Sequence, residues 1–191
     1  MRLLHTADWH LGRTLEGRDR LPEHEAFFDE LQEIVVAEKI DVILMAGDVF
    51  DSVNPPAAAE ALFYESLARL SDKGRRPIVV IAGNHDHPDR LAAARTIAEE
   101  QSISIVGYPL KTSLRINVPA SGDVLHVAAL PYPSESRLRV SLIEEGEAER
   151  LREAYDERIR TIFAKLTRTF RPDEVNIAMS HLFVAGGAAS D

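Results

Sequence analysis

Three short segments of the chain combine aspartate, histidine or asparagine with an abrupt change from apolar to polar residues. They are Asp8-Trp9-His10, Gly47-Asp48-Val49-Phe50-Asp51 and Gly83-Asn84-His85-Asp86, and a later histidine, His181, follows another apolar run. Carboxylate, imidazole and neutral amide groups are all ligands for divalent cations. A carboxylate such as Asp48 can give one oxygen to each of two cations. Two cations about 4 Å apart would bind a phosphate and lower the pKa of a bound water, so the segments predict phosphate chemistry.

Each of these segments follows an apolar run that is typical of a buried β-strand. The runs are Leu3-Leu4, Val42–Met45, Ile78–Ile81, Ile103–Val106 and Ile177–Met179. Helical patterns at about 23–38 and 55–72 separate the first three, with Asn54 as the expected cap and Pro55 at the first helical position. This order predicts a parallel sheet with right-handed crossovers. Because ligands bind beyond the carboxyl ends of parallel strands, the polar segments are expected to meet at one point.

The second half of the chain has a different pattern. Leu114–Val118 and Val124–Val127 read as strands without an intervening helix, which predicts a second sheet or an antiparallel extension of the first. Glu144 to about Thr169 predicts a long charged helix. Its apolar stripe consists of Leu151, Ala154, Tyr155, Ile159, Ile162, Phe163 and Leu166. The chain is therefore expected to be an α/β protein, with residues 1–191 in one domain.

Composition limits the classes of function. The 191 residues are 45% hydrophobic and 28% charged, which is typical of a globular protein. The absence of cysteine excludes disulfides, thiolate nucleophiles and cysteine zinc sites. No apolar run approaches membrane-spanning length and no signal-peptide pattern opens the chain, so a cytoplasmic location is expected. The formal charge of −9 argues against binding nucleic acid by electrostatics alone.

Taken together, the motifs resemble those of the calcineurin-like metallophosphoesterases. Within that superfamily, His5–Gly12, Gly47–Asp51 followed by Pro55-Pro56, and Ser180–Phe183 are similar to the SbcD nucleases, and the resemblance extends from Arg2 to Asp191. It implies an α/β fold of the metallophosphoesterase type, a two-sheet β-sandwich flanked by helices. It also implies a nuclease that cuts duplex DNA ends in the 3′ to 5′ direction and cuts single strands and hairpins.

The same resemblance assigns roles to individual residues. One metal would be held by Asp8, His10 and the bridging Asp48, and the other by Asp48, Asn84 and His181. His85 would be the catalytic imidazole, oriented by Asp51. The expected cofactors are two divalent metal ions, Mn²⁺ in preference to Mg²⁺ or Fe²⁺. The expected partners are DNA, an SbcC-like SMC-type ATPase subunit and a second copy of the chain.

One feature departs from the family pattern. The family supplies two further imidazole ligands from a Gly-His-x-His motif, which is absent here because His181 is the last histidine. The resemblance therefore implies that the chain stops before this motif and lacks the capping domain and the segment that docks the ATPase. Each metal would then lack one imidazole ligand.

Other interpretations of the same residues remain open. A phosphatase or small-molecule phosphodiesterase would use the same scaffold, and so would a non-catalytic binding module such as the metallophosphoesterase-fold retromer subunit. Asp48 and Asn84 could cap helices, and His181 could be a core histidine. Trp9 could stack on a base or pack beneath the site. Two neighbours of His85 are expected to have no direct role: Asp86 as a structural turn residue and His87 as a solvent-facing one.

The segment 55–72 contains more apolar residues than one core-facing stripe requires. Its apolar residues include Ala58, Ala61, Leu62, Phe63, Tyr64, Leu67, Ala68 and Leu70. We expect a homodimer interface here, and the alternative is a helix buried on two sides by its own domain. DNA would then be held by the metals, by local arginines such as Arg13 or Arg18, and by the dimer or partner.

Overall fold

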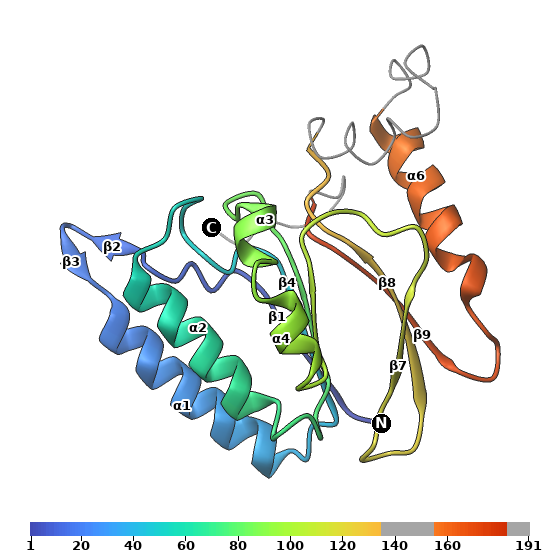
Figure 1. The fold of residues 1–191 in the computed structure, drawn as a ribbon, viewed down its shortest axis with the longest axis horizontal. Coiled ribbons are helices and arrows are strands. Elements are labelled where there is room, and N and C mark those ends of the chain that lie inside the picture. The colour runs from blue at the N-terminus through green and yellow to red at the C-terminus, as the bar shows by residue number, and fades with distance from the viewer. Residues whose placement is uncertain (135–154, 183–191) are drawn as a thin grey trace.

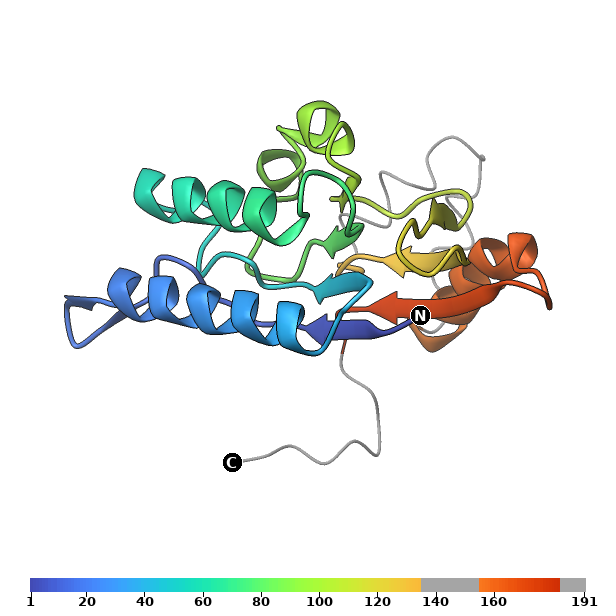
Figure 2. The same ribbon diagram turned by 90° about the horizontal axis from the view of Figure 1, so that it is seen from below.

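The computed structural model describes residues 1–134 and 155–182, which are arranged in layers. Helices α1 (Leu21–Ala37) and α2 (Ala57–Leu70) lie side by side over one face of a first sheet (Figures 1 and 2). A second sheet packs against the other face, and α6 (Tyr155–Leu166) covers the outer side of that second sheet. The predicted α/β sandwich flanked by helices is confirmed.

The first sheet contains β1 (Leu3–Thr6), β4 (Val42–Ala46), β5 (Ile78–Ile81) and β6 (Ile103–Val106) in the order β1-β4-β5-β6. All neighbouring pairs are parallel, as the alternation of strands and helices predicted. All these strands therefore end at the same edge of the sheet. A short hairpin of β2 (Thr14–Leu15) and β3 (Arg18–Asp19) lies between β1 and α1, and α3 (Pro88–Leu91) and α4 (Arg95–Glu99) connect β5 to β6.

Strand β4 shows why the sheet is sandwiched between two cores. Its five residues are all buried, as expected for a parallel strand covered on both faces. Ile43 and Met45 point into the core beneath α1 and α2, while Val42 and Leu44 point into the core between the sheets. This period of two explains the uninterrupted apolar run in the sequence.

The second sheet contains β7 (Leu114–Asn117), β8 (Val124–Leu130) and β9 (Val175–Ser180) in the order β7-β8-β9. β7 and β8 are antiparallel, whereas β8 and β9 are parallel. Helix α6 packs on this sheet through Ile159, Ile162, Phe163 and Leu166. Of the two predicted alternatives, the separate second sheet is therefore the correct one. Its strand β9 ends one residue before His181.

The predicted start of the second helix is wrong. Helix α2 begins at Ala57, with Pro56 in the N-cap position, and Asn54 does not cap it: its Oδ1 accepts a hydrogen bond from Arg90. The reason is steric, because a residue that precedes a proline is disfavoured in the helical conformation. Pro55 precedes Pro56, so the helix starts only after the second proline.

The long predicted helix is confirmed where the structure describes it. Tyr155–Leu166 is α-helical, and a 3-10 turn, η3 (Thr167–Thr169), continues it to the expected end. Its first part, with Leu151 and Ala154, lies outside the described residues. Among the described helices, none is long and apolar enough to cross a membrane, and the cytoplasmic location stays a prediction.

Phe63 on α2 tests the core beneath the helices. Its side chain is fully buried and packs edge-on against Phe50, with ring centroids 5.3 Å apart. Phe63→Ala should lower the free energy of unfolding by about 3–5 kcal/mol because it leaves a cavity. The matched control is Phe27→Ala on α1, where the ring is 37% exposed, with an expected loss of about 1 kcal/mol. Urea denaturation measures both, and equal losses would contradict this view of the core.

Candidate metal centre

The loops that follow β1 and β4 run side by side beyond the ends of their strands. Asp8 N donates to Gly47 O at 3.0 Å, His10 N to Asp48 O at 3.1 Å, and Leu11 N to Val49 O at 2.9 Å. These hydrogen bonds continue the parallel pairing of β1 with β4 into the loops. They place the Asp8-Trp9-His10 segment next to Asp48, as the sequence predicted.

The same loops contain residues in a backbone conformation that amino acids other than glycine rarely adopt. Asp8, His10 and Asp48 have φ angles of 56°, 47° and 53°, all in the left-handed region. Each such residue costs roughly 1–2 kcal/mol unless the surroundings hold it in place. Strain of this kind tends to lie at functional sites. Here it falls on three of the residues that the sequence selected as metal ligands.

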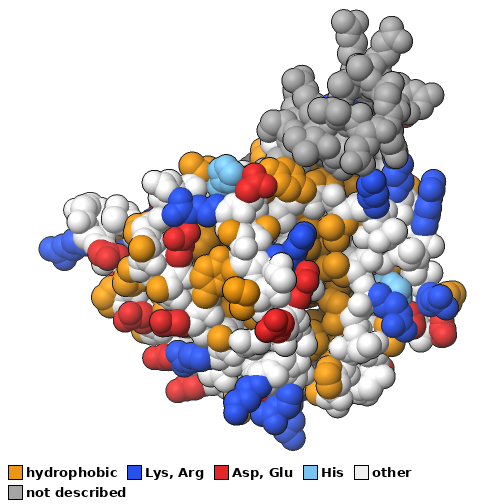
Figure 3. Space-filling model, in the orientation of Figure 1, with side chains coloured by type: hydrophobic (Ala, Val, Ile, Leu, Met, Phe, Trp, Pro, Cys, Tyr) orange, Lys and Arg blue, Asp and Glu red, His pale blue; other side chains and the backbone are white. Residues whose placement is uncertain are grey.

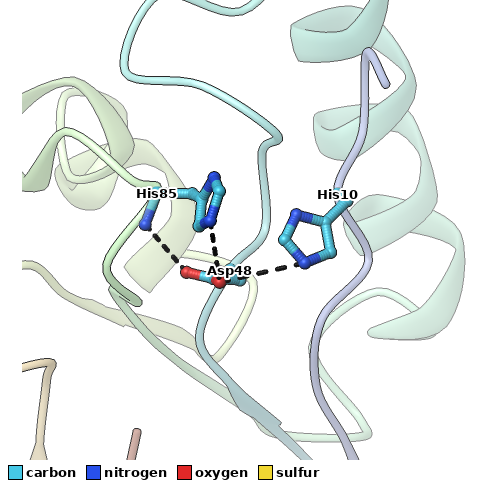
Figure 4. A group of neighbouring side chains, drawn as sticks. All are labelled: His10, Asp48 and His85. Atoms are coloured by element: carbon cyan, nitrogen blue, oxygen red, sulfur yellow. Dashed lines mark hydrogen bonds and ion pairs between the residues drawn. The ribbon is translucent and has the colours of Figure 1, made fainter. Parts of the chain in front are cut away.

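The carboxylate of Asp48 lies at the centre of the cluster. Its side chain is 5% exposed, and Oδ2 lies 3.8 Å from His10 Nε2, 3.9 Å from His85 Nε2 and 3.6 Å from His181 Nε2. Figure 4 shows the rings of His10 and His85 next to each other, both turned toward Asp48. Asp48 Oδ1 accepts a hydrogen bond from His85 N at 2.9 Å. One carboxylate is thus shared by imidazoles from three separate segments.

The remaining candidate ligands lie beside these imidazoles. Asp8 Oδ1 is 3.9 Å from His10 Nε2, and Asn84 Oδ1 is 3.0 Å from His181 Nε2. Ligand atoms of Asp8, Asp48 and His181 all lie within 4.8 Å of one another, and so do those of His10, Asp48 and His85. The structure therefore brings together all six residues that the sequence singled out.

The tautomer of His181 shows whether these residues fit a cation. His181 Nδ1 lies 2.7 Å from the carbonyl oxygen of Ala46, which can only accept, so Nδ1 carries the proton. In the neutral ring Nε2 then has a lone pair, and it faces Asn84 Oδ1 and Asp48 Oδ2. Three electron-rich atoms that face one another suit a cation placed among them, and a carbonyl on the other ring nitrogen is typical of a metal-binding histidine.

Asp51 contacts two of the imidazoles. Its carboxylate Oδ1 lies 3.3 Å from His10 Nδ1, and its main-chain carbonyl oxygen lies 2.8 Å from His85 Nδ1. The predicted link between Asp51 and His85 therefore exists, but the main chain makes it. Sequence reasoning missed the contact with His10, for which the short spacing between Asp48 and Asp51 was the available signal.

Two glycines allow the cluster to close. Gly47 has a φ of 92°, and a Cβ there would lie 2.5 Å from His181 Nδ1. At Gly83 a Cβ would lie 2.1 Å from both the amide nitrogen and Oδ1 of Asp48. The positive φ of Gly47 is a second reason for glycine there. Gly83 has no positive φ, and it is required because Asp48 approaches its backbone closely.

Neighbouring residues of the motifs have structural roles. Trp9 is 6% exposed, donates to Thr6 Oγ1 at 2.9 Å and packs edge-on against Phe28, so packing beneath the site is the correct alternative. His87 is exposed and accepts from Arg90 N at the start of α3. Asp86 is fully buried, and burial raises the pKa of its carboxyl group, against the opposing effect of backbone hydrogen bonds. That neither His87 nor Asp86 binds metal stays a prediction.

Gly83→Ala tests the close approach at Asp48. The added methyl group would displace the Asp48 carboxylate, so the affinity for Mn²⁺ should fall by at least about 10-fold. Isothermal titration calorimetry measures this directly. The control is Gly17→Ala in the β2–β3 hairpin, where the φ of 77° strains an alanine but no atom lies within 4 Å of the new Cβ. Wild-type affinity in Gly83→Ala would show that the cluster binds no metal through Asp48.

Two curated proteins and one solved structure are among those similar to this chain. The SbcD subunit of the Bacillus subtilis nuclease SbcCD is 57% identical over 191 residues, which is 100% of this chain and 49% of that protein. The SbcD subunit of the Rhodobacter capsulatus nuclease SbcCD is 46% identical over 108 residues, 56% of this chain and 27% of that protein. A crystal structure of Pseudomonas putida nuclease MPE aligns with a TM-score of 0.39 and 20% identity, covering 70% of this chain and 55% of that chain.

The chain thus spans about half the length of the Bacillus relative. The family model of the calcineurin-like phosphoesterases matches residues 1–188. With the match covering almost the whole chain, the protein belongs to the calcineurin-like phosphoesterase family.

Proposed function

We propose that the chain forms the catalytic part of a metal-dependent DNA nuclease of the SbcCD type. The observation that carries this proposal is the convergence of three imidazoles on one oxygen of Asp48. The similarity to proteins named as SbcD subunits of the nuclease SbcCD favours DNA as the substrate over other phosphate esters. A 3′ to 5′ exonuclease on duplex ends and an endonuclease on single strands and hairpins are the activities we propose.

The proposed ligands divide into two sets that share Asp48. Asp8, His10 and Asp48 would hold one cation, and Asp48, Asn84 and His181 would hold the other, with Mn²⁺ as the proposed metal. When bound, two such cations bind the phosphodiester and lower the pKa of a water molecule. His10 Nε2 and His181 Nε2 lie 3.8 Å and 3.6 Å from the same Asp48 oxygen, which is consistent with a carboxylate shared by both sets.

His85 is the proposed catalytic imidazole. The carbonyl oxygen of Asp51 accepts from Nδ1, which fixes the ring and turns Nε2 toward Asp48. The side chain is 43% exposed, so a substrate phosphate can reach it. As an imidazolium, His85 would donate the Nε2 proton to the oxygen that leaves phosphorus, so that the leaving strand departs as a neutral hydroxyl.

DNA would be held mainly at the cluster and not by a broad basic surface. On the face shown in Figure 3, acidic and basic side chains are intermixed over α1 and α2, and no single basic patch covers them. Arg13 and Arg18 are exposed on the segment that leaves the cluster through the β2–β3 hairpin. We propose that they contact phosphates beside the scissile one, and that an SbcC-like ATPase subunit supplies the remaining contacts with DNA.

His85→Ala separates catalysis from metal binding. Cleavage of duplex and single-stranded DNA should fall by at least about 100-fold, because general acid catalysis contributes at least this much. Affinity for Mn²⁺ should be essentially unchanged, since His85 is not a proposed ligand. The measurements are a Mn²⁺ titration of DNA cleavage and calorimetry of both proteins.

A substrate comparison separates the nuclease from its alternatives. The wild-type chain should cleave DNA in preference to a chromogenic phosphomonoester or phosphodiester. Faster hydrolysis of the small esters would replace the proposal by a phosphatase or small-molecule phosphodiesterase. A chain that binds Mn²⁺ and hydrolyses none of these substrates would instead be a binding module.

A homodimer through the helix at 55–72 is the second part of the proposal. Much of the apolar surface of α2 lies in its own core: Ala59, Phe63, Leu67 and Leu70 are buried. Ala58, Ala61 and Ala68 remain exposed, and hydrophobic side chains are visible over this helix in Figure 3. Neighbouring α1 adds Phe27 and Ile34, which are 37% and 42% exposed. Small side chains flanked by larger apolar ones suit close packing of helices from two copies.

Ala61→Glu tests the dimer. A carboxylate in the proposed interface would be desolvated without a partner, so the variant should be monomeric at concentrations where the wild type dimerises. Sedimentation equilibrium at micromolar concentration reports the mass. Ala164→Glu on α6, where the alanine is also exposed, should leave the mass unchanged. A monomeric wild type would remove this part of the proposal.

A further inference from the structure

One buried carboxylate beside the cluster has no part in the mechanism proposed above. Asp86 is fully buried, between the two loops that follow β4 and β5. Its Oδ2 accepts from Gly83 N at 2.7 Å and from Val49 N at 3.2 Å, and its Oδ1 accepts from Phe50 N at 2.9 Å. Two of these donors belong to the other loop, 36 and 37 residues away in the sequence.

The bracing between the loops is reciprocal. Asp86 of the β5 loop accepts from the β4 loop at Val49 and Phe50, while Asp48 of the β4 loop accepts from His85 N of the β5 loop at 2.9 Å. The two aspartates therefore hold the loops together in both directions. Asp48 directly precedes Val49, and His85 directly precedes Asp86. A shift of either loop would therefore move the proposed bridging carboxylate and the proposed catalytic imidazole relative to each other.

Asp86 makes more of the contacts between the loops, because it accepts from two backbone N–H groups of the other loop whereas Asp48 accepts from one. Hydrogen bonds from backbone N–H groups to a buried carboxylate are charge-assisted and are about twice as strong as neutral ones. They hold Val49 and Phe50 immediately after Asp48, whose φ of 53° is strained. A strained residue keeps its conformation only when its surroundings fix it. Without Asp86, the N–H groups of Val49 and Phe50 would be buried without these acceptors, and the Asp48 backbone could relax.

We propose that Asp86 is a positioning residue that sets the geometry of the metal centre by fixing Asp48 against His85. The proposal rests on the function proposed above, because it concerns the same cluster. Asp86 touches neither metal nor substrate, and it acts through the loop that carries Asp48. A carboxylate that only stabilised the fold would have no effect on metal affinity in the folded protein.

Asp86→Asn is the informative variant, because it keeps the shape of the side chain and replaces one acceptor oxygen by an amide donor. That donor would face a backbone N–H group whichever way the amide is turned. The matched control is Asp89→Asn three residues later: Asp89 is exposed, and its carboxylate accepts from Tyr108 OH at 2.9 Å, away from the cluster.

In folded Asp86→Asn, calorimetry should show Mn²⁺ affinity reduced by about 10- to 100-fold, the range found when groups that orient metal ligands are removed. The metal-free protein should exchange the amide hydrogens of Val49 and Phe50 faster than the wild type. In DNA cleavage, kcat should fall while KM for DNA stays unchanged. Asp89→Asn should match the wild type in all three measurements.

Asp86→Glu keeps the charge but moves it by one methylene group, and it serves as the second variant if Asp86→Asn does not fold. It should show the same loss of affinity and the same faster exchange. Wild-type Mn²⁺ affinity and amide exchange in a folded Asp86 variant would overturn the proposal, even if its melting temperature were lower. These two measurements need no DNA. A wild-type chain that cleaves no DNA would therefore refute the proposed function and leave the comparison of affinities intact.

Discussion

The charge on Asp48 is the constraint on which the site depends. This carboxylate has a side chain only 5% exposed, and its Oδ2 lies within 3.9 Å of three imidazoles. A buried carboxylate is costly unless opposite charge compensates it. Divalent cations between the carboxylate and the rings would supply this opposite charge. The same loops hold Asp8, His10 and Asp48 in left-handed backbone, which fits a site whose geometry is held for binding.

The sandwich explains how residues from distant parts of the chain reach this carboxylate. Parallel β1, β4 and β5 end at one edge and deliver Asp8, His10, Asp48, Asn84 and His85. His181 comes from the other sheet, at the end of β9, and its Nδ1 lies 2.7 Å from the carbonyl oxygen of Ala46 at the end of β4. Tyr132 N, after β8, donates to Ala82 O, after β5, at 2.8 Å. These contacts join the two sheets at the edge where the cluster lies, and Gly47 leaves the space for the His181 ring.

Much of this arrangement could be predicted from the sequence, because alternating apolar runs and helical patterns specify a parallel sheet and parallel strands bring their following loops together. The six clustered residues were found by their types and positions, and which of them bind metal stays a prediction. Three features could not be read in the same way. The His85 contact with Asp51 uses a main-chain carbonyl, which any residue supplies. The need for glycine at position 83 comes from Asp48, in another loop. The hydrogen bond from Val49 N to Asp86, 37 residues later in the sequence, likewise depends on tertiary packing. The start of α2 was predictable, since Pro55-Pro56 forbids helix at the first proline.

The central claim is that two cations share Asp48. Anomalous X-ray diffraction from crystals grown with Mn²⁺ tests it most directly, because the signal locates manganese without any assumption about ligands. The account predicts two peaks about 4 Å apart, one beside Asp8 and His10 and the other beside Asn84 and His181, with the Asp48 carboxylate between them. Manganese peaks elsewhere, or no peak near Asp48 in crystals that bind manganese, would contradict it.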